Sequence, residues 1–202
     1  ISRFRNKSWS DPRMLSISKP DTWDSSPCFS RDGRTIYFSS LRDDPDAQGG
    51  LDLYSARMDP RGRFTKVRNL GPEINTPGDE QRPYLHPDGK TLYFASNGHP
   101  GLGKTDVYKS SLKEDGEWGI PVNLGYPINS SEVEFGLYVA ADGKTAYFSS
   151  NREGGYGDMD IYSFELPRSA QPAVVISVKG VIKDKTSKEY LAANIKISEL
   201  ES

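Results

Sequence analysis

A segment of about 54 residues occurs three times in this 202-residue chain, and this repeat limits the possible folds more than any other feature. Each copy has an Asp-Gly pair and then a short stretch that contains Tyr-Phe and ends in Ser. A second aspartate follows at the equivalent position of every copy. The anchors recur at Asp32, Asp88 and Asp142, at Tyr37, Tyr93 and Tyr147, and at Asp52, Asp106 and Asp160. Several anchors with one spacing indicate three copies of one structural unit.

Each copy predicts four short strands and no amphipathic helix of useful length. Asp-Gly suits a tight hairpin turn because its glycine accepts positive φ. Stretches such as 35–39 are rich in β-branched and aromatic residues, as strands are. A thin sheet cannot bury both faces alone, whereas stacked sheets cover one another. The sequence therefore predicts an all-β chain of three four-stranded antiparallel blades of a larger β-propeller.

Aromatic residues are predicted to lie on both faces of every sheet. Neighbouring residues of a strand point to opposite faces, so the tyrosine and phenylalanine of each Tyr-Phe pair should separate. The phenylalanines are Phe38, Phe94 and Phe148. A third recurring aromatic position, at Trp9, Phe64 and Trp118, is expected to pack between the outer strands of adjacent blades.

The predicted organisation has three parts. Residues 1–166 are the blades, with repeats at about 9–56, 64–110 and 118–166. Residues 167–172 form a linker, and residues 173–202 resemble the first strands of a β-sandwich, with a turn near 184–188. Both ends look cut. Three blades are too few for a closed ring, which predicts further blades upstream and apolar faces that lead the fragment to associate.

Composition excludes several classes of function. The formal net charge of −2 gives no electrostatic support for nucleic-acid binding. The longest apolar stretch, 173–178, is far shorter than the ~20 residues of a membrane helix. The single cysteine, Cys28, cannot form an internal disulfide and is interpreted as a small apolar residue of a strand.

The sequence shows no catalytic, cofactor-binding or metal-binding signature, so the chain is predicted not to be an enzyme. The only histidines are His86 and His99, and no Gly-x-Ser-x-Gly motif occurs. The glycine-rich stretch 101–105 lacks the spacing of a phosphate loop. Calcium is conceivable at two groups of loop aspartates, although solvated charge is the simpler interpretation. These groups are Asp43, Asp44 and Asp46, and Asp158 and Asp160.

Binding is expected in the loops that differ most between copies, because a constant scaffold commonly presents variable loops to partners. These loops are 41–51, 97–105 and 151–159. The candidate interaction residues are Arg42, His99, Arg152 and Tyr156. Tyr126 and Tyr156 are candidates for stacking on sugars, but packing in the core or at the rim is the preferred interpretation. The recurring aspartates at 52, 106 and 160 are expected to bond nearby backbone.

The repeat resembles the TolB-type, WD-like propeller repeat, from Trp9 to Leu166. The shared pattern is Pro-x-Phe-Ser-x-Asp-Gly-Lys, an aromatic strand, and then Gly-Gly-x-Asp-[Ile/Leu]-Tyr. Copy three departs from it, with Gly136 in place of the strand-leading proline. The stretch 178–195, which contains Val-Lys-Gly-Val-Ile-Lys-Asp and Tyr-Leu-Ala-Ala-Asn-Ile, is similar to the start of a carboxypeptidase-regulatory-like domain.

This combination resembles a group of Bacteroidetes OmpA-family envelope proteins, including the PorE-like lipoproteins of type IX secretion. The resemblance implies a protein-interaction scaffold in the periplasm, associated with the outer membrane. Its partners would be other envelope or secretion-system proteins, and peptidoglycan would be bound only by a domain outside residues 1–202. Two alternatives stay open: a propeller that gates the substrates of a peptidase, and a glycan-binding module.

Overall fold

The computed structural model describes residues 1–2, 4–140, 142–175 and 181–191. Within these ranges the regular secondary structure consists of strands, which confirms the predicted all-β class. Among the described residues, no helix has the length and apolar character needed to cross a membrane.

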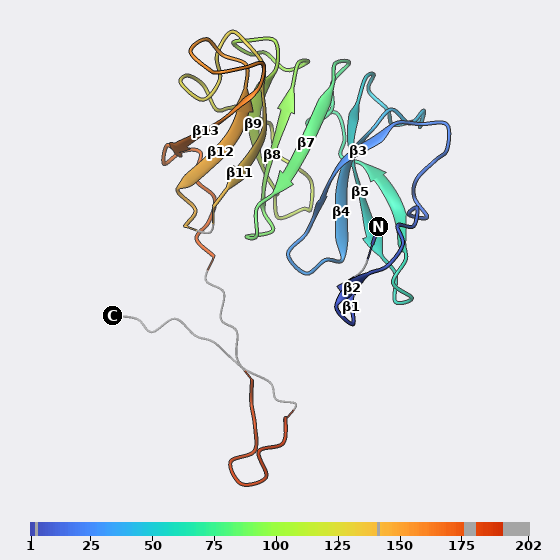
Figure 1. Cartoon of the computed structure of the whole chain (residues 1–202). Coiled ribbons are helices and arrows are strands. Elements are labelled where there is room, and N and C mark those ends of the chain that lie inside the picture. Colours follow the sequence, from blue (N-terminus) through green and yellow to red (C-terminus); the bar gives the residue numbers. More distant parts are fainter. Residues whose placement is uncertain (3, 141, 176–180, 192–202) are drawn as a thin grey trace.

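Three antiparallel sheets follow one another along the chain (Figure 1). The first sheet has the order β3 (Asp24–Phe29), β4 (Thr35–Ser40), β5 (Asp52–Met58) and β6 (Phe64–Asn69). The second has the order β7 (Glu80–Leu85), β8 (Thr91–Ser96), β9 (Asp106–Ser111) and β10 (Val122–Asn123). The third contains β11 (Glu134–Val139), β12 (Thr145–Ser150) and β13 (Asp160–Glu165). A separate hairpin pairs β1 (Phe4–Arg5) with β2 (Ser8–Trp9).

The first two sheets thus have the four strands that were predicted, whereas the third has three among the described residues. The sequence repeats and the sheets are also offset from each other. The repeated stretches that begin at Phe64 and Trp118 supply β6 and β10, the last strands of the first and second sheets. Each of the first two sheets therefore takes its last strand from the beginning of the next sequence repeat.

The Asp-Gly pairs form the hairpin turns for which they are suited. Asp88 shows the mechanism: its Oδ1 accepts hydrogen bonds at 2.9 Å from the backbone N–H groups of both Lys90 and Thr91. These bonds fix the turn and lower the pKa of Asp88 against the effect of burial, which acts in the opposite direction. The glycines have positive φ, at +67° for Gly33, +70° for Gly89 and +68° for Gly143.

A bulge interrupts the first strand of every sheet. The residue with positive φ at this bulge is Ser26 in β3, Arg82 in β7 and Gly136 in β11. Gly136 therefore corresponds to the bulge residue. The sequence comparison placed it at the position of the leading proline, and this prediction is wrong. Leu137 holds the proline position in the third copy.

The sheets stack face to face (Figure 1). Clusters of buried apolar side chains lie between them. Phe94 of β8 packs in one cluster with Leu53 of the first sheet, while the adjacent Tyr93 packs with Phe148 of the third. This confirms the predicted separation of each Tyr-Phe pair. Burial of one such ring contributes roughly 2–3 kcal/mol. Tyr147, whose outer side no described sheet covers, remains 42% exposed.

The third recurring aromatic position behaves differently in the three copies. Phe64 and Trp118 are buried, and the Trp118 ring lies 6.2 Å from Tyr37 of the first sheet, edge-on. Trp9 is 70% exposed, and its ring lies 5.2 Å from that of Phe4, tilted by 55°, within the small hairpin. The prediction of an inter-sheet position is therefore wrong for Trp9, because its strand pairs with β1 and not with a sheet edge.

Residues 167–172, expected to be a linker, pack against the second and third sheets. Ala170 is buried, and its carbonyl oxygen accepts a hydrogen bond from the Tyr93 hydroxyl at 2.6 Å. Lys109 Nζ donates to the carbonyl oxygens of Ser169 and Gln171, both at 3.0 Å. This segment therefore covers part of the core beside β9.

The predicted turn near 184–188 is present in a hairpin in which Lys183 pairs with Tyr190. Asp184 Oδ1 accepts the backbone N–H groups of Thr186 and Ser187. The strand predicted at 174–182 lies partly, and that at 193–198 wholly, outside the described residues.

Candidate functional site

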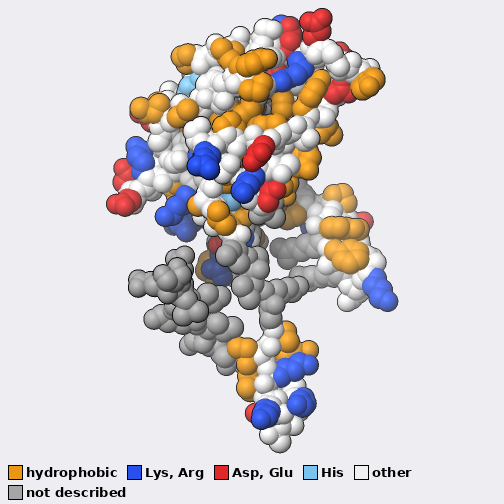
Figure 2. All heavy atoms as spheres, turned by 90° about the vertical axis from the view of Figure 1, so that its left-hand side faces the viewer, with side chains coloured by type: hydrophobic (Ala, Val, Ile, Leu, Met, Phe, Trp, Pro, Cys, Tyr) orange, Lys and Arg blue, Asp and Glu red, His pale blue; other side chains and the backbone are white. Residues whose placement is uncertain are grey.

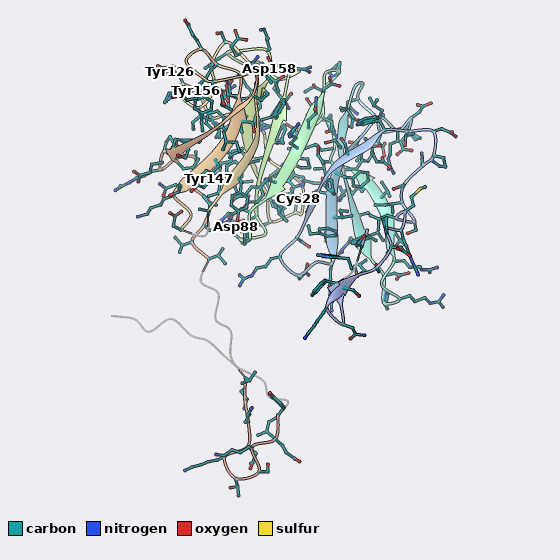
Figure 3. All side chains as sticks on the ribbon, in the orientation of Figure 1. Cys28, Asp88, Tyr126, Tyr147, Tyr156 and Asp158 are labelled. Atoms are coloured by element: carbon teal, nitrogen blue, oxygen red, sulfur yellow. The ribbon has the colours of Figure 1, made fainter. Side chains whose placement is uncertain are left out.

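The long loops of the three sheets lie at one end of the stack (Figure 1). This loop-bearing end consists of residues 41–51, 97–105 and 151–159, together with the crossovers 70–79 and 124–133. The tight Asp-Gly turns lie at the opposite end, where Figure 3 shows Asp88, whereas Tyr126, Tyr156 and Asp158 lie at the loop-bearing end. Variable loops on a repeated frame make this end the candidate site.

A buried carboxylate supports the loop-bearing end. Glu134 is 0% exposed and accepts hydrogen bonds from the hydroxyls of Ser130 at 2.6 Å and Ser150 at 2.8 Å. Glu80, also 0% exposed, accepts one from the Ser96 hydroxyl at 2.6 Å. Burial raises the pKa of Glu80, and the hydrogen bond from Ser96 opposes this rise. These bonds join the start of the first strand to the end of the second.

An arginine completes the cluster in the first and third sheets. Arg42 forms a 2.9 Å ion pair with Asp24, and Arg152 a 3.2 Å ion pair with Glu134. Each guanidinium also lies over two rings of its own sheet, which adds a cation–π attraction. The rings are Phe38 and Tyr54 at 4.9 and 5.0 Å from Arg42, and Phe148 and Tyr162 at 4.8 and 5.2 Å from Arg152.

In the second sheet, His99 occupies the position that Arg42 and Arg152 have in the first and third sheets. Its Nε2 lies 2.8 Å from the carbonyl oxygen of Ile74, which requires Nε2 to carry the proton and donate. Arg42 and Arg152 donate in the same way to the carbonyl oxygens of Ile17 and Ile128. The ring of His99 lies 5.9 Å from Phe94 and 5.2 Å from Tyr108, the pair equivalent to the rings beneath each arginine.

The four residues predicted to contact partners are therefore not equivalent. Arg42 is 3% exposed, and its guanidinium binds groups inside the protein. The prediction that Arg42 contacts a partner is therefore wrong. Arg152 and His99 are partly buried by the same kind of contacts. Tyr156 is fully exposed. A charged side chain in a loop was interpreted as a surface group, whereas the buried carboxylates draw these arginines inward.

The recurring aspartates hold the loops by their backbone, as predicted. Asp52 accepts the N–H of Gln48 at 2.8 Å, Asp106 that of Gly103 at 3.1 Å, and Asp160 that of Tyr156 at 2.6 Å. A side chain at Gly155 would clash with Asp160, since a Cβ there would lie 2.3 Å from Oδ2. These bonds fix the backbone of the loops, while their side chains stay free to vary.

Sequence reasoning missed the residues that build this frame. Glu80 and Glu134 are 54 residues apart, as are Asn75 and Asn129, so the same spacing that located the strands contained the signal. Asn75 and Asn129 are both buried and bond to the strand backbone. The spacing was used to locate strands and turns and was not applied to these polar residues, so their structural role was not predicted.

The loop-bearing end exposes aromatic, apolar and acidic side chains together. Tyr126 is 84% and Leu102 56% exposed, and Tyr156 is fully exposed. The sequence-based preference for packing of Tyr126 and Tyr156 is therefore wrong. Exposed carboxylates at this end are Asp43, Asp46, Glu73, Glu153 and Asp158. Lysines pair with two further carboxylates of this end: Lys104 with Glu132 at 2.7 Å, and Lys19, from outside it, with Asp44 at 3.1 Å.

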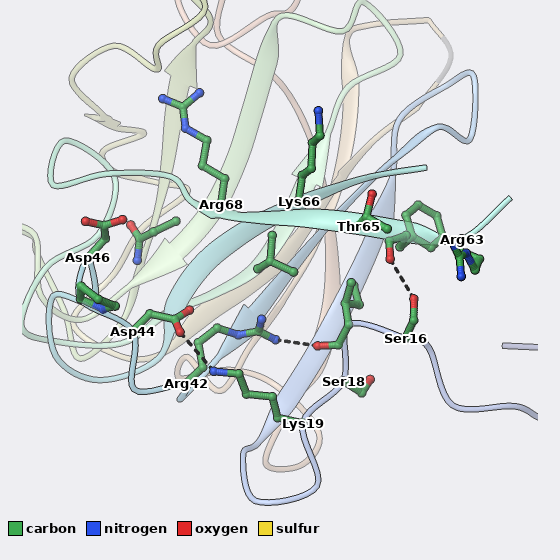
Figure 4. A pocket seen from close by; sticks show the side chains of 15 residues that line it. Ser16, Ser18, Lys19, Arg42, Asp44, Asp46, Arg63, Thr65, Lys66 and Arg68 are labelled. Carbon is green, nitrogen blue, oxygen red and sulfur yellow. Dashed lines mark hydrogen bonds and ion pairs between the residues drawn. The ribbon is translucent and has the colours of Figure 1, made fainter. Parts of the chain in front are cut away.

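A groove of about 700 Å³ runs between residues 16–19, the loop containing Asp44 and strand β6 (Figure 4). Ser16 Oγ donates to the carbonyl oxygen of Phe64 at 2.8 Å and ties its two walls together. Lys66 and Arg68 point to the other side of β6 from Arg42 (Figure 4). Among the described residues, its lining contains neither histidine nor cysteine.

The histidines and aspartates considered for catalysis or metal binding do not converge. His86 lies at the turn end, where its Nδ1 is 3.4 Å from Asp88 Oδ2, and burial lowers its pKa. His99 is bound to a backbone carbonyl oxygen. Among the described residues, no group of three or more His, Cys, Asp or Glu side chains is arranged to hold a metal ion.

No family model matches the sequence, and no curated protein matches it. Among solved structures, the chain is similar to the crystal structure of alpha-L-arabinofuranosidase from Lactobacillus brevis, with 16% sequence identity and a TM-score of 0.44. The match covers 83% of this chain and 60% of the other, so the chain spans less than two thirds of that enzyme's length.

This comparison contradicts the prediction that the chain is not an enzyme, because the similar protein is one. The absence of a catalytic motif was taken to exclude catalysis, yet activity depends on side chains that meet only in the folded protein. At this degree of similarity, the comparison gives no argument for a particular reaction.

Proposed function

We propose that the three sheets are β-propeller blades and that the chain serves as a protein-interaction scaffold whose loop-bearing end binds partners. The carrying observation is the exposure of Tyr126, Tyr156 and Leu102 on loops whose backbone is fixed by buried polar groups. Rigid loops lose little conformational entropy on binding, and exposed aromatic residues provide contact area.

The propeller assignment is supported by the way the sheets stack. Each of the first two sheets covers one face of the next through repeated positions, as blades do. The resemblance of the repeats to the TolB type supports the same assignment. Together with the similarity of the tail to a carboxypeptidase-regulatory-like domain, it supports a place in the bacterial envelope, in the periplasm and near the outer membrane.

The charge of the loop-bearing end suggests what kind of partner it binds. Its exposed carboxylates exceed its unpaired cations, since the arginines at positions 42 and 152 are drawn into the protein. A partner segment with basic and apolar side chains would complement this surface. Envelope or secretion-system proteins with such segments are the proposed partners.

Site-specific photocrosslinking tests the proposal. A photoreactive amino acid is placed at Tyr126 or Tyr156, and at Glu114 or Lys144 at the opposite end as controls of similar exposure. In intact cells, the loop-bearing positions are expected to give discrete protein adducts and the control positions none. Equal labelling from both ends, or no adduct at all, would refute the proposal. Fractionation of the same cells tests whether the adducts sediment with the outer membrane.

Glycan binding is a second candidate, because Tyr126 and Tyr156 present exposed rings at the same end. Aromatic rings of this kind can stack on sugars. A glycan array with the wild-type chain and with the Tyr126→Ala/Tyr156→Ala variant separates the two functions. Sugar binding that the double variant loses would favour glycan binding, whereas an array without hits would eliminate it.

A further inference from the structure

The first and second sheets close their outer edge with the same pair of side chains. In the first, Asn69 Nδ2 donates to Asp52 Oδ2 at 2.8 Å, and in the second Asn123 Nδ2 donates to Asp106 Oδ2 at 2.8 Å. The asparagine lies on the last strand and the aspartate at the start of the third. This bond therefore links the last strand to the residue that holds the loop.

A second asparagine strengthens the same edge. Asn75 Oδ1 accepts the backbone N–H of Leu53 at 2.8 Å, and its Nδ2 donates to the carbonyl oxygen of Leu53 at 3.0 Å. Asn129 makes the same two bonds to Val107, at 2.8 and 2.9 Å. Leu53 and Val107 are both 0% exposed. One carboxamide thus satisfies both outward-pointing backbone groups of a strand residue.

The third sheet has the aspartate and the strand residue that the asparagines bind in the first two sheets, but no described asparagine binds them. Asp160 accepts the N–H groups of Tyr156 and Gly157, as Asp106 does in its own loop. Strand β13 is the edge of the sheet, and Ile161, the counterpart of Leu53 and Val107, is 79% exposed. No described residue makes the corresponding bonds to Asp160 or Ile161.

The outer side of the third sheet is apolar around this edge. Tyr138, Tyr147 and Ile161 are 53%, 42% and 79% exposed, although their counterparts in the second sheet are largely buried. Figure 2, which views this side of the molecule, shows hydrophobic side chains gathered there. A strand added to β13 would therefore cover apolar surface as well as pair backbone groups.

Residues 1–202 contain no further segment with the asparagine pattern that closes the first two sheets. The tripeptide Asn-Leu-Gly occurs only at 69–71 and 123–125, and both copies are already used. The related stretch 9–15 has Met14 at the asparagine position. At the next repeat positions the chain has Ser177 and Lys183, and Lys183 pairs with Tyr190.

We propose that β13 binds an extended segment of a partner polypeptide with the sequence character Asn-Leu-Gly-x-x-Ile-Asn. Its first asparagine donates to Asp160, and its second binds the backbone N–H and carbonyl oxygen of Ile161. Addition of a strand to an exposed edge supplies main-chain hydrogen bonds, while the two asparagines select the register. This site is independent of the partner proposed for the loop-bearing end.

The test uses a peptide with the sequence of residues 122–131, Val-Asn-Leu-Gly-Tyr-Pro-Ile-Asn-Ser-Ser, labelled for fluorescence anisotropy. The wild-type chain is expected to bind it saturably. A control peptide with both asparagines changed to alanine should bind at least about tenfold more weakly, since each lost bond to a buried group costs about 1 kcal/mol or more.

Two protein variants locate the binding site. Asp160→Asn removes the carboxylate acceptor, and Ile161→Pro removes the outward N–H while β12 still pairs with this strand. Both should weaken binding of the wild-type peptide by about tenfold, whereas Asp115→Asn at an exposed turn should not. Circular dichroism confirms that each variant is folded, and a misfolded variant is replaced by Ile161→N-methyl-alanine made by semisynthesis.

Three results would overturn the proposal. One is the absence of saturable binding by the wild-type peptide. Another is equal binding of the two peptides, which would indicate edge pairing without selection for asparagine. The third is a concentration-dependent dimer in sedimentation that competes with the peptide, since the edge would then bind a second copy of this chain. The outcome does not depend on photocrosslinking at Tyr126 or Tyr156.

Discussion

The hydroxyl of Ser96 donates a 2.6 Å hydrogen bond to the carboxylate of Glu80, and neither side chain has meaningful contact with solvent. The bond spans β7 and β8, which pair at these two residues. Glu80 also accepts the N–H and hydroxyl of Thr76, so one carboxylate joins two strands and the incoming crossover. The frame of the loop-bearing end therefore depends on buried polar groups as well as on the apolar core.

Glu80→Ala should be strongly destabilising. It leaves the partly buried N–H of Thr76 without an acceptor and opens a cavity at a fully buried position, which together should lower the free energy of unfolding by about 3 kcal/mol. Urea denaturation measures the loss. Glu114→Ala, at an exposed turn, is the matched control and should change it by less than about 0.5 kcal/mol. Similar losses for both variants would contradict the role of the buried carboxylate.

Loss of Arg152 should cost more than loss of His99. Arg152→Ala leaves the 0%-exposed carboxylate of Glu134 without its cation, and breaking a buried pair in this way costs about 3 kcal/mol. His99→Ala removes a packed ring and one bond to a carbonyl oxygen, for about 1–2 kcal/mol. Unfolding curves of the two variants give the order, and the reverse order would show that the ion pair adds nothing.

Asn75→Asp should be about as harmful as Asn75→Ala, despite its similar shape. A carboxylate cannot donate to the carbonyl oxygen of Leu53 or to Asn69 Oδ1. The carboxylate oxygen would instead lie against these two oxygen acceptors with no hydrogen between them. Each variant should lose about 2–3 kcal/mol of stability. Thermal unfolding with Lys113→Ala as a surface control measures this, and a mild effect of aspartate would indicate that the carboxamide's donor group is dispensable.

Stability should fall as the pH drops below the ordinary histidine pKa of 6.5, in part because of His86. Burial lowers the pKa of His86 in the folded protein, so the unfolded chain binds the proton first. The stabilisation is present above pH 6.5 and is lost as the pH falls toward the lowered pKa. His86→Ser, which copies Ser30 of the first repeat, should flatten this part of the curve. Melting temperatures between about pH 5 and 8 test it, and parallel curves would contradict it.

Cys28 should alkylate slowly. Burial raises the pKa of its thiol, so little thiolate forms near neutral pH, and Sγ already accepts the N–H of Leu85 at 3.3 Å. Iodoacetamide at pH 8 should therefore modify the folded chain far more slowly than the urea-unfolded chain. Comparable rates, measured by mass spectrometry, would mean that the thiol is accessible in the native state.

The repeated strands were predictable from sequence because their signal is local. Asp-Gly turns and alternating aromatic strands depend on backbone geometry within a few residues, so Asp32 and the stretch from Thr35 could be interpreted directly. The opposite orientation of Tyr93 and Phe94 followed from strand alternation alone. The predicted backbone contacts of Asp160 are confirmed for the same reason.

The use of each charged side chain was decided by the tertiary structure. Arg42 and Tyr156 both lie in variable loops, yet one is buried over two rings and the other is fully exposed. The burial of Arg42 depends on Asp24, which lies eighteen residues earlier, at the start of β3. Sequence determined the strands and turns through local geometry. The fold determined which polar residues became the frame, because a buried charge is tolerated only where distant parts of the chain supply its partners.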